Sequence, residues 1–311
     1  MAKLLIFHQG ALGDFAAVFP AILRLRENFP QIAVLCQSSL GKLACSLNVA
    51  TQCFPSESAI FASLYSDRPD IRVQHLLRAY DEIILFSYSE SLKRTVSQVN
   101  KNVCLIFPRP DVSQQIHITA HIFSNLIRCG LLKADEPAPA SDRDRRDKNF
   151  DSKKIWLHPG SGSKRKNWDI SNFKRVGEIL ASNRKRIEFI LGPAEYFMTD
   201  MLKKDDPDRI VHRISDLPEL LSLLRTAGGF IGNDSGVSHL AAFLGLPTVA
   251  VFGPSDPQRW KPSGRSAAAV RPDNLDCRPC FETNSENCDN AECLNRIMPE
   301  NVVRAFYRVL K

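Results

Sequence analysis

A short polar run near residue 234 carries side chains suited to holding an anion. Residues 233–236, Asn-Asp-Ser-Gly, are typical of a turn followed by a helix N-cap, and His239 falls one turn further on. Free backbone N–H groups at a helix start, together with the helix dipole, favour a phosphate. Ser235 and Gly236 would let a diphosphate approach, and Asp234 can accept hydrogen bonds from hydroxyl groups. The run predicts either a phosphate-binding helix start or an ordinary cap beside a buried histidine.

A second candidate for phosphate binding is the glycine- and serine-rich loop at residues 159–163, which three successive cations follow at 164–166. Small residues expose backbone N–H groups and cations supply charge, and a phosphate-binding loop needs both. Its candidate contacts are Ser161, Gly162 and Lys166. The spacing lacks the GK[ST] ending of a Walker A loop, which disfavours P-loop ATP hydrolysis. A solvated basic loop is the alternative interpretation.

Two carboxylates follow predicted strands. Asp14 comes after the turn Gly10–Gly13 near the N-terminus, at the expected start of a helix, where it could serve as a helix cap or as a general base. Gly13 is a candidate nucleotide contact in this turn, although the GxxG spacing lacks the third glycine of a dinucleotide fingerprint. Glu195 follows Gly192-Pro193-Ala194 and could hold ribose hydroxyls.

Apolar runs and helical patterns alternate along both halves of the chain and should position these side chains. Strands are expected at 3–8, 32–36, 83–86, 103–107, 154–158, 186–191, 228–232 and 248–252. Helices are expected from residue 15 to 28 with a kink or a start at Pro20, and at 40–47, 116–132, 171–180, 214–226 and 299–311. The alternation predicts an α/β fold with a parallel, doubly wound sheet in each half. The loops at Ser161–Lys166, Gly192–Glu195 and Asp234–His239 should then converge at one sheet edge, which Asp14 would face across a cleft.

Composition favours two domains and an acidic partner. The chain has 311 residues, 44% hydrophobic and 24% charged, with a formal net charge of +7. The stretch Lys133–Asp151 is typical of a linker, and the predicted domains are 1–148 and 149–311. No apolar run reaches the ~20 residues of a membrane span, and no signal-peptide pattern is present. We expect a cytoplasmic protein that could touch the inner membrane, and no nucleic-acid binding, since basic and aromatic residues do not interleave.

Three ordered motifs together resemble a known family. They are GALGDFAAVFPAI, LHPGSGSKRKNWDISNF and GNDSGVSHLAAFLGLPTVAVFGPSDP, and they span nearly the whole chain. The chain resembles glycosyltransferase family nine, the heptosyltransferases of the bacterial lipopolysaccharide inner core. The resemblance implies the GT-B architecture, which is two Rossmann-like domains facing across a cleft. The C-terminal domain would bind the nucleotide sugar, and the terminal helix often crosses back to the first domain.

The resemblance also implies roles for the candidate residues. Asp14 matches the proposed catalytic base, and Lys166, in the K-x-W pattern, matches the lysine that holds the donor diphosphate. Ser161 and Gly162 fall on the phosphate-contacting loop, where Gly162 departs from the usual hydroxylated residue. The remaining matches are to the donor-binding signature at Asp234, Ser235, Gly236 and His239 and to the ribose-binding glutamate at Glu195.

The implied reaction is an inverting, metal-independent transfer of heptose from ADP-heptose to a lipopolysaccharide core acceptor. The donor is a substrate, so no cofactor is required, and no Asp-x-Asp metal motif lies in a plausible loop; Asp205-Asp206 fits a solvated helix end. The acceptor would be an anionic glycolipid, chosen by first-domain loops such as Ser56–Asp70 and Ser87–Ser97. Two alternatives are a GT-B transferase for another NDP-sugar and a non-catalytic nucleotide-sugar-binding relative.

Four of the nine cysteines cluster near the C-terminus at Cys277, Cys280, Cys288 and Cys293. The C-x2-C knuckle is compatible with structural zinc, but the second pair is spaced loosely and no histidine lies nearby. The pattern therefore predicts either a metal site or packed, reduced thiols. Disulfides are disfavoured in a reducing cytoplasm.

Overall fold

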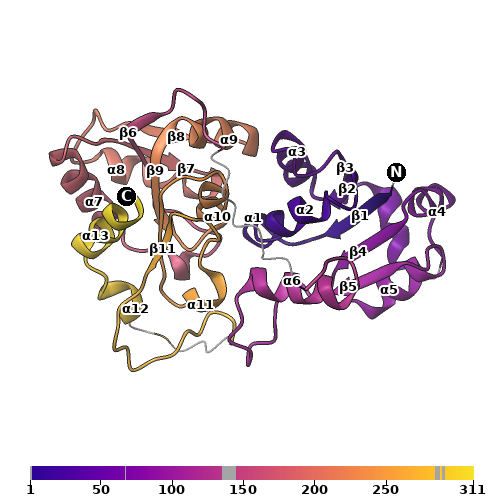
Figure 1. Cartoon of the computed structure of the whole chain (residues 1–311). Helices are drawn as coiled ribbons and strands as arrows, with labels where there is room; N and C mark the ends of the chain where they lie inside the picture. The colour runs from indigo at the N-terminus through magenta and orange to yellow at the C-terminus, as the bar shows by residue number, and fades with distance from the viewer. Residues whose placement is uncertain (1, 67, 135–144, 284–287, 289–290) are drawn as a thin grey trace. The chain divides into compact units, whose positions relative to one another are not determined.

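The computed structural model describes residues 2–66, 68–134, 145–283, 288 and 291–311. The chain divides into two compact units (Figure 1). The first comprises Met1–Asp111 and Ile118–Pro139, and the second comprises Val112–His117 and Ala140–Lys311. The linker predicted at 133–151 lies largely outside the described residues, and the domain boundary predicted after residue 148 stays a prediction. Nothing in the sequence indicated that the short segment Val112–His117 would belong to the second unit.

The first unit is built on one parallel sheet of five strands in the order β3-β2-β1-β4-β5. The strands are β1 (Lys3–His8), β2 (Gln31–Cys36), β3 (Gln52–Pro55), β4 (Glu82–Phe86) and β5 (Val103–Ile106). The connecting helices are α1 (Leu12–Ala16), α2 (Phe19–Leu25), α3 (Ser38–Ser46), the 3₁₀ helix η1 (Ala59–Tyr65), α4 (Ile71–Arg78), α5 (Glu90–Ser97) and α6 (Ile118–Arg128). Leu5 of the central strand pairs with Ala33 of β2 and Ile83 of β4.

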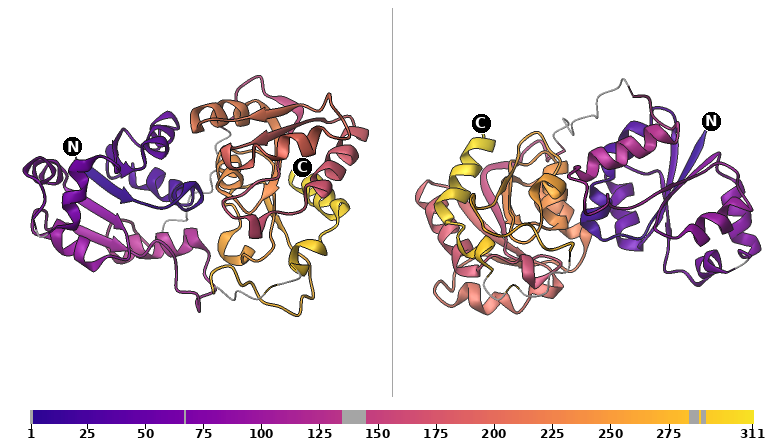
Figure 2. Two further views of the ribbon diagram at one scale, coloured as in Figure 1. Left: turned by 180° about the vertical axis from the view of Figure 1, so that it is seen from behind. Right: turned by 90° about the horizontal axis from the view of Figure 1, so that it is seen from below.

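Both faces of this sheet are buried, which explains why its strands are continuously apolar. Leu5 and Phe7 pack in a core with η1, α4 and α5, while Leu4 and Ile6, which point to the opposite face, are equally buried. Helices cover the sheet on both sides in the two further views (Figure 2). The doubly wound prediction is confirmed for this half.

Several local predictions for the first unit were incomplete. The segment 87–97, expected to be a loop that helps choose the acceptor, contains helix α5, whose N-terminus is capped by Ser89 accepting from the Leu92 N–H at 3.1 Å. The segment 56–70 contains η1 rather than only loop. Strand β3 and helix α4 were not predicted. Pro20 lies in the first turn of α2, so of the two alternatives predicted for it, the helix start is confirmed.

One disulfide is present that the sequence did not predict. Cys104 of β5 and Cys129, just after α6, form a disulfide across 25 residues of sequence. The pairing could not be inferred from spacing, because it depends on α6 packing beside β5. Its effect is to fasten the edge strand of the first sheet to the helix that covers it.

The second unit contains a six-stranded parallel sheet in the order β11-β10-β9-β6-β7-β8. Its strands are β6 (Asp151–His158), β7 (Arg186–Leu191), β8 (Val211–Arg213), β9 (Ala227–Asn233), β10 (Thr248–Val251) and β11 (Ala267–Val270). Its helices are η2 (Lys164–Lys166), α7 (Ile170–Ser182), η3 (Pro193–Glu195), α8 (Met198–Lys203), α9 (Leu217–Arg225), α10 (Gly236–Phe243), α11 (Pro257–Trp260), α12 (Glu292–Asn295) and α13 (Pro299–Val309). The strand order is again that of a doubly wound fold.

The C-terminal helix α13 completes the core of the second unit. Its apolar face, Val302, Val303 and Phe306, packs against α7, β10 and β11. The apolar stripe was predicted correctly. The family-based expectation that this helix crosses back to the first domain stays a prediction.

The topology determines where ligands can bind. In an open parallel sheet the crevice lies outside the carboxyl ends of the strands where the winding reverses. In the first unit that point is between β1 and β4, and in the second it is between β6 and β9. The loops that carry Asp14, Lys166 and Asp234 follow β1, β6 and β9. Among the described residues, no helix is long and apolar enough to cross a membrane.

Candidate active site

Asn233 joins the two phosphate-binding candidates of the second unit. It is the last residue of β9 and is fully buried. Its side-chain amide donates to the carbonyl of Pro159 at 2.7 Å, and its carbonyl oxygen accepts from the N–H of Trp168 at 3.1 Å. The loop after β6 is therefore held at both ends against the carboxyl end of β9. The sequence pattern indicated only a turn residue at Asn233, because its partners Pro159 and Trp168 are distant in the chain.

Lys166 and Asp234 meet within this arrangement. Lys166 Nζ lies 2.7 Å from Asp234 Oδ2, and both side chains are largely buried. The ring of Phe281 covers the same ammonium at 4.1 Å from its centroid. An aromatic face attracts a cation without neutralising it, so Phe281 restrains Lys166 while leaving its charge available to a ligand. Phe281 was not identified from the sequence, because it lies 115 residues away in the cysteine-rich loop.

Helix α10 begins where the motif predicted. Ser235 is its N-cap and accepts from the N–H of Ser238 at 3.4 Å, and Gly236 is its first residue. Ser238, which is fully buried, donates its hydroxyl to the Asn233 carbonyl at 2.6 Å. His239 is buried in the first turn. The predicted helix start is confirmed, and its first N–H groups adjoin the Lys166–Asp234 pair.

Glu195 is placed by close packing. It ends η3 and is 7% exposed. A Cβ at Gly160 would overlap the Glu195 side chain, and one at Gly192 would lie 2.8 Å from Glu195 Oε2. Both glycines are thus needed to admit the carboxylate beside the loop after β6. The neighbouring His158 has its pKa lowered, chiefly because burial penalises its charged form.

Ser161 and Gly162 lie in the loop that Asn233 holds. The Ser161 hydroxyl lies 2.6 Å from Asn167 Oδ1 and 2.7 Å from the Ser163 carbonyl, so it stabilises the loop itself. Gly162 is exposed, with open space where a Cβ would stand. All the donor-site candidates of the second unit therefore gather at the carboxyl ends of β6, β7 and β9.

Asp14 and Gly13 belong to the first unit. Asp14 lies in the first turn of α1, and its carboxylate receives two hydrogen bonds from Arg109, Nε to Oδ1 and Nη2 to Oδ2, both 3.0 Å. The N-cap position of α1 is Ala11, which makes no side-chain hydrogen bond, and the Asp14 carboxylate is paired with Arg109. Asp14 is therefore an oriented, paired carboxylate here and not a helix cap. Arg109, 95 residues away, was not foreseen. Burial lowers the pKa of nearby His8 to about 4, against the opposing charge of Asp14.

The four clustered cysteines line one cavity of the second unit. Burial raises the pKa of the Cys293 thiol, and the neighbouring Cys277, Cys280 and Cys288 act in the same direction. In the part of the chain that the structure describes, no three His, Cys, Asp or Glu side chains form a group that could hold a metal ion. The choice between a metal site and packed thiols stays a prediction.

Comparison with known proteins places the chain in a family. The model described as glycosyltransferase family 9 (heptosyltransferase) matches residues 88–289. Lipooligosaccharide heptosyltransferase 2 of Campylobacter jejuni is 26% identical over 165 residues, which cover 50% of this chain and 51% of the relative. Lipopolysaccharide heptosyltransferase 3 of Escherichia coli is 26% identical over 148 residues, or 46% of this chain and 42% of the relative. The chain thus aligns with about half the length of these curated relatives.

Solved structures share the fold over nearly the whole chain. A family 9 glycosyltransferase from Veillonella parvula superposes with a TM-score of 0.77 at 16% identity, over 99% of this chain and 97% of that one. The Escherichia coli heptosyltransferase WaaC, solved with ADP, gives 0.71 at 16% identity over 99% of both chains. Two parallel-sheet α/β units with these neighbours are the GT-B architecture expected from the sequence. With the family model covering well over half of its residues, the chain belongs to glycosyltransferase family 9.

Proposed function

We propose that the protein is an inverting glycosyltransferase that moves a heptose from ADP-heptose to a lipopolysaccharide core acceptor. The observation that carries the proposal is the Lys166–Asp234 pair at the start of α10, with Glu195 on an adjacent loop. A cation beside free helix N–H groups suits a diphosphate, and a buried carboxylate nearby suits ribose hydroxyls. The names of the curated relatives support heptose as the sugar.

In this proposal the second unit stabilises the leaving group. As the bond between the anomeric carbon and the diphosphate oxygen breaks, negative charge grows on the phosphate. Lys166 and the N–H groups of Ser235 and Gly236 would stabilise that charge, and they would do so from positions that the fold already fixes. Preorganised donors of this kind contribute roughly 10²–10³ in rate each. We propose that these groups suffice without a metal ion and that no cofactor is required.

The first unit would supply the base. Asp14 would take the proton of an acceptor hydroxyl, whose oxygen forms the new bond to the anomeric carbon from the face opposite the departing ADP. A single displacement of this kind inverts the anomeric centre. Arg109 supports the role by holding the carboxylate in one orientation through two hydrogen bonds. A general base typically contributes about 10²–10⁴ in rate.

The acceptor and its location form part of the proposal. An anionic glycolipid would be reached at the cytoplasmic face of the inner membrane, by peripheral contact. The formal net charge of +7 supports attraction to such a surface.

The test combines donor binding with transfer. Native protein, Asp14→Asn and Lys166→Met are assayed for ADP affinity and for heptose transfer to a deacylated core acceptor, with and without EDTA. We expect Asp14→Asn to bind ADP normally and lose at least about 100-fold in kcat. Lys166→Met should lose ADP affinity as well, and EDTA should change nothing.

Other outcomes separate the alternatives. Binding of UDP or GDP, without binding of ADP, would indicate that the enzyme is a glycosyltransferase with a different nucleotide-sugar donor. Nucleotide-sugar binding without transfer to any core acceptor would favour a non-catalytic relative. Full activity of Asp14→Asn would exclude Asp14 as the base.

A further inference from the structure

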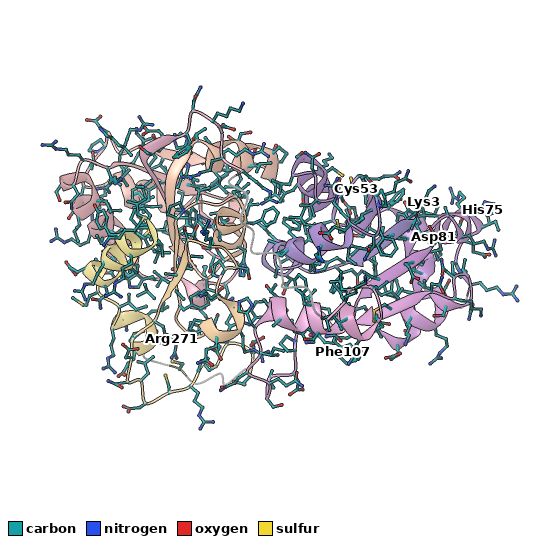
Figure 3. The ribbon with its side chains drawn as sticks, viewed as in Figure 1. Lys3, Cys53, His75, Asp81, Phe107 and Arg271 are labelled. Carbon is teal, nitrogen blue, oxygen red and sulfur yellow. A yellow bond between two sulfur atoms is a disulfide. The ribbon has the colours of Figure 1, made fainter. Side chains whose placement is uncertain are left out.

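Two exposed aromatic side chains of the first unit lie against each other. Tyr88 is 62% exposed, and Phe107, which is labelled in Figure 3, is 49% exposed. Their ring centroids are 5.6 Å apart, and the ring planes are inclined by 36°. Single exposed apolar side chains are common on folded proteins, but two adjacent rings leave a contiguous apolar surface in water. We call this surface the aromatic pair.

The sheet topology places the aromatic pair at the ligand-binding edge of the first unit. Tyr88 follows β4 and Phe107 follows β5, so both lie beyond the carboxyl ends of neighbouring strands. Strand β4 also pairs with β1, which precedes the loop that leads to Asp14. Since neighbouring strands are about 4.8 Å apart, the ends of β1 and β5 are separated by roughly 10 Å. The aromatic pair therefore shares the edge where an open parallel sheet binds its ligands with Asp14.

The backbone that carries each ring is held in place. His121 Nε2 of α6 lies 2.9 Å from the carbonyl oxygen of Phe107, at the end of β5. The Ser89 N–H donates to Ser87 Oγ at 3.1 Å and so closes the turn that contains Tyr88. A surface that is already ordered costs a ligand less to bind. The rings are thus exposed on fixed loops, as expected for a preorganised binding surface.

A short path joins the aromatic pair to the proposed base. Arg109 stands two residues after Phe107 and donates two hydrogen bonds of 3.0 Å to the Asp14 carboxylate. The loop after β5 therefore carries one ring of the pair and also orients Asp14. A ligand that lies on the rings would neighbour the group from which Asp14 takes a proton.

The chemistry of the aromatic pair favours a sugar ring. An aromatic face carries partial negative charge, so it attracts the C–H hydrogens on one face of a pyranose, whose hydroxyl groups stay in water. An anionic group is repelled by the same ring faces. An acyl chain is disfavoured, because it would remove water from the charged Asp14–Arg109 pair without replacing its hydrogen bonds.

We propose that Tyr88 and Phe107 stack on the C–H face of a pyranose in the acceptor and hold that sugar next to Asp14. The proposal rests on the proposed transferase function for the identity of the acceptor, whereas the stacking surface rests on the two rings. The aromatic pair would thus select the acceptor by the shape of a sugar face and not by its charge.

The first experiment measures sugar binding to the full chain by saturation-transfer NMR. The probe is methyl β-D-glucopyranoside, glycerol is a polyol without a ring, and dihexanoylphosphatidylcholine supplies acyl chains. We expect transfer to concentrate on the hydrogens of one ring face of the glucoside, and no transfer to glycerol. Phe107→Leu and Tyr88→Leu keep an apolar side chain without a ring and should each weaken glucoside binding about fivefold. Phe107→Tyr keeps the ring and should retain native binding.

The matched control is Phe197→Leu, which removes a ring of the second unit that is 56% exposed and should change nothing. Thermal unfolding establishes that each variant is folded before its affinity is interpreted. Even transfer over the whole glucoside, or native glucoside binding in both folded leucine variants, would overturn the proposal. Ring-dependent binding of the phosphatidylcholine without binding of the glucoside would overturn it as well and would assign the rings to a lipid.

The second experiment separates this proposal from the proposed function. With active enzyme, Phe107→Leu should raise the KM for the deacylated core acceptor about fivefold, with ADP affinity unchanged and Phe107→Tyr close to native. An unchanged acceptor KM would overturn the proposal and leave the transferase function intact. Conversely, ring-dependent binding of the glucoside in a protein that transfers no heptose would refute the proposed reaction and keep the sugar-stacking surface.

Discussion

Lys166 shows how one side chain depends on residues distant in sequence. Its ammonium is held by Asp234 at 2.7 Å and covered by the Phe281 ring. A second carboxylate in the place of that ring would compete with a diphosphate for the charge, whereas an aromatic face does not. The loop that carries Phe281 is fastened in turn, because Cys280 and Phe281 both donate their N–H groups to the Pro254 carbonyl.

Replacing Phe281 with leucine should weaken ADP binding. The substitution removes the cation–π contact but keeps an apolar side chain, at a cost of about 1 kcal/mol, or roughly fivefold in Kd. Calorimetry with ADP measures it, and Phe281→Tyr should restore most of the affinity. The control is Phe197→Leu, an exposed ring 5.9 Å from Lys164 Nζ, for which we expect no change. Native affinity in Phe281→Leu would show that the ring does not position Lys166.

At the scale of elements, the carboxyl ends of β6 and β9 work as one unit. Asn233 ends β9 and bonds to both sides of the loop after β6, while Ser235 starts α10 immediately afterwards. The strand, the loop and the helix start are therefore coupled through one buried amide. An asparagine in an exposed turn could be substituted at little cost, but the hydrogen-bond partners of Asn233 are buried backbone groups.

Asn233→Ala should destabilise the second unit and its ligand site together. It leaves the Trp168 N–H and the Pro159 carbonyl without partners, at a cost of about 1–3 kcal/mol each when buried. Urea unfolding should show a loss of roughly 2–6 kcal/mol, accompanied by weaker ADP binding. Asn183→Ala, which removes an exposed side-chain bond to the Ile179 carbonyl, is the matched control. Comparable losses in the two variants would contradict the assigned role.

The end of β1 should make the first unit sensitive to acid. His8 is buried between Phe15 and Phe86, and burial lowers its pKa from 6.5 to about 4. Because the folded pKa is below the unfolded one, the contribution to stability is complete above pH 6.5 and is lost as the pH falls through 4. We expect His8→Phe to lose less stability than the native protein between pH 7 and pH 4, as measured by urea unfolding. Exposed His75→Gln should follow the native curve.

On the scale of the whole molecule, the chain repeats one architecture twice. Both sheets are parallel and doubly wound, and each places its candidate residues after the strands at the reversal point. The two units differ in how they are fastened. The first has a disulfide from β5 to the end of α6, and the second has the C-terminal helix α13 packed on α7, β10 and β11.

The disulfide should stabilise the first unit selectively. Closing a loop of 25 residues restricts the unfolded chain and is worth about 3 kcal/mol. Hydrogen exchange with and without reductant should therefore show faster opening of β1, β4 and β5, while β6 and β9 keep their protection. In the Cys104→Ser/Cys129→Ser variant the reductant should have no effect. An equal increase in hydrogen exchange in both sheets would show that the disulfide does not stabilise the first unit selectively.

The sequence by itself determined the strand–helix alternation, the helix start at Ser235 and the family motifs. These features follow from local causes, namely apolar periodicity, cap chemistry and ordered short motifs. Asp216, for example, caps α9 near the start of the helix predicted at 214–226, accepting from the Glu219 N–H at 2.8 Å. Helix α5 was missed because only one face of its short polar sequence is apolar, so that burial against η1 and β5 decides it.

Only the tertiary structure decided which residues support the candidate ones. Arg109 reaches Asp14 across 95 positions, and Phe281 reaches Lys166 across 115, so neither pairing leaves a periodic signal in the chain. The Cys104–Cys129 bond and the contact between Tyr88 and Phe107 are likewise consequences of packing between distant segments. A sequence pattern reports the conformation of neighbouring residues. The environment of a charge depends on what the fold brings against it.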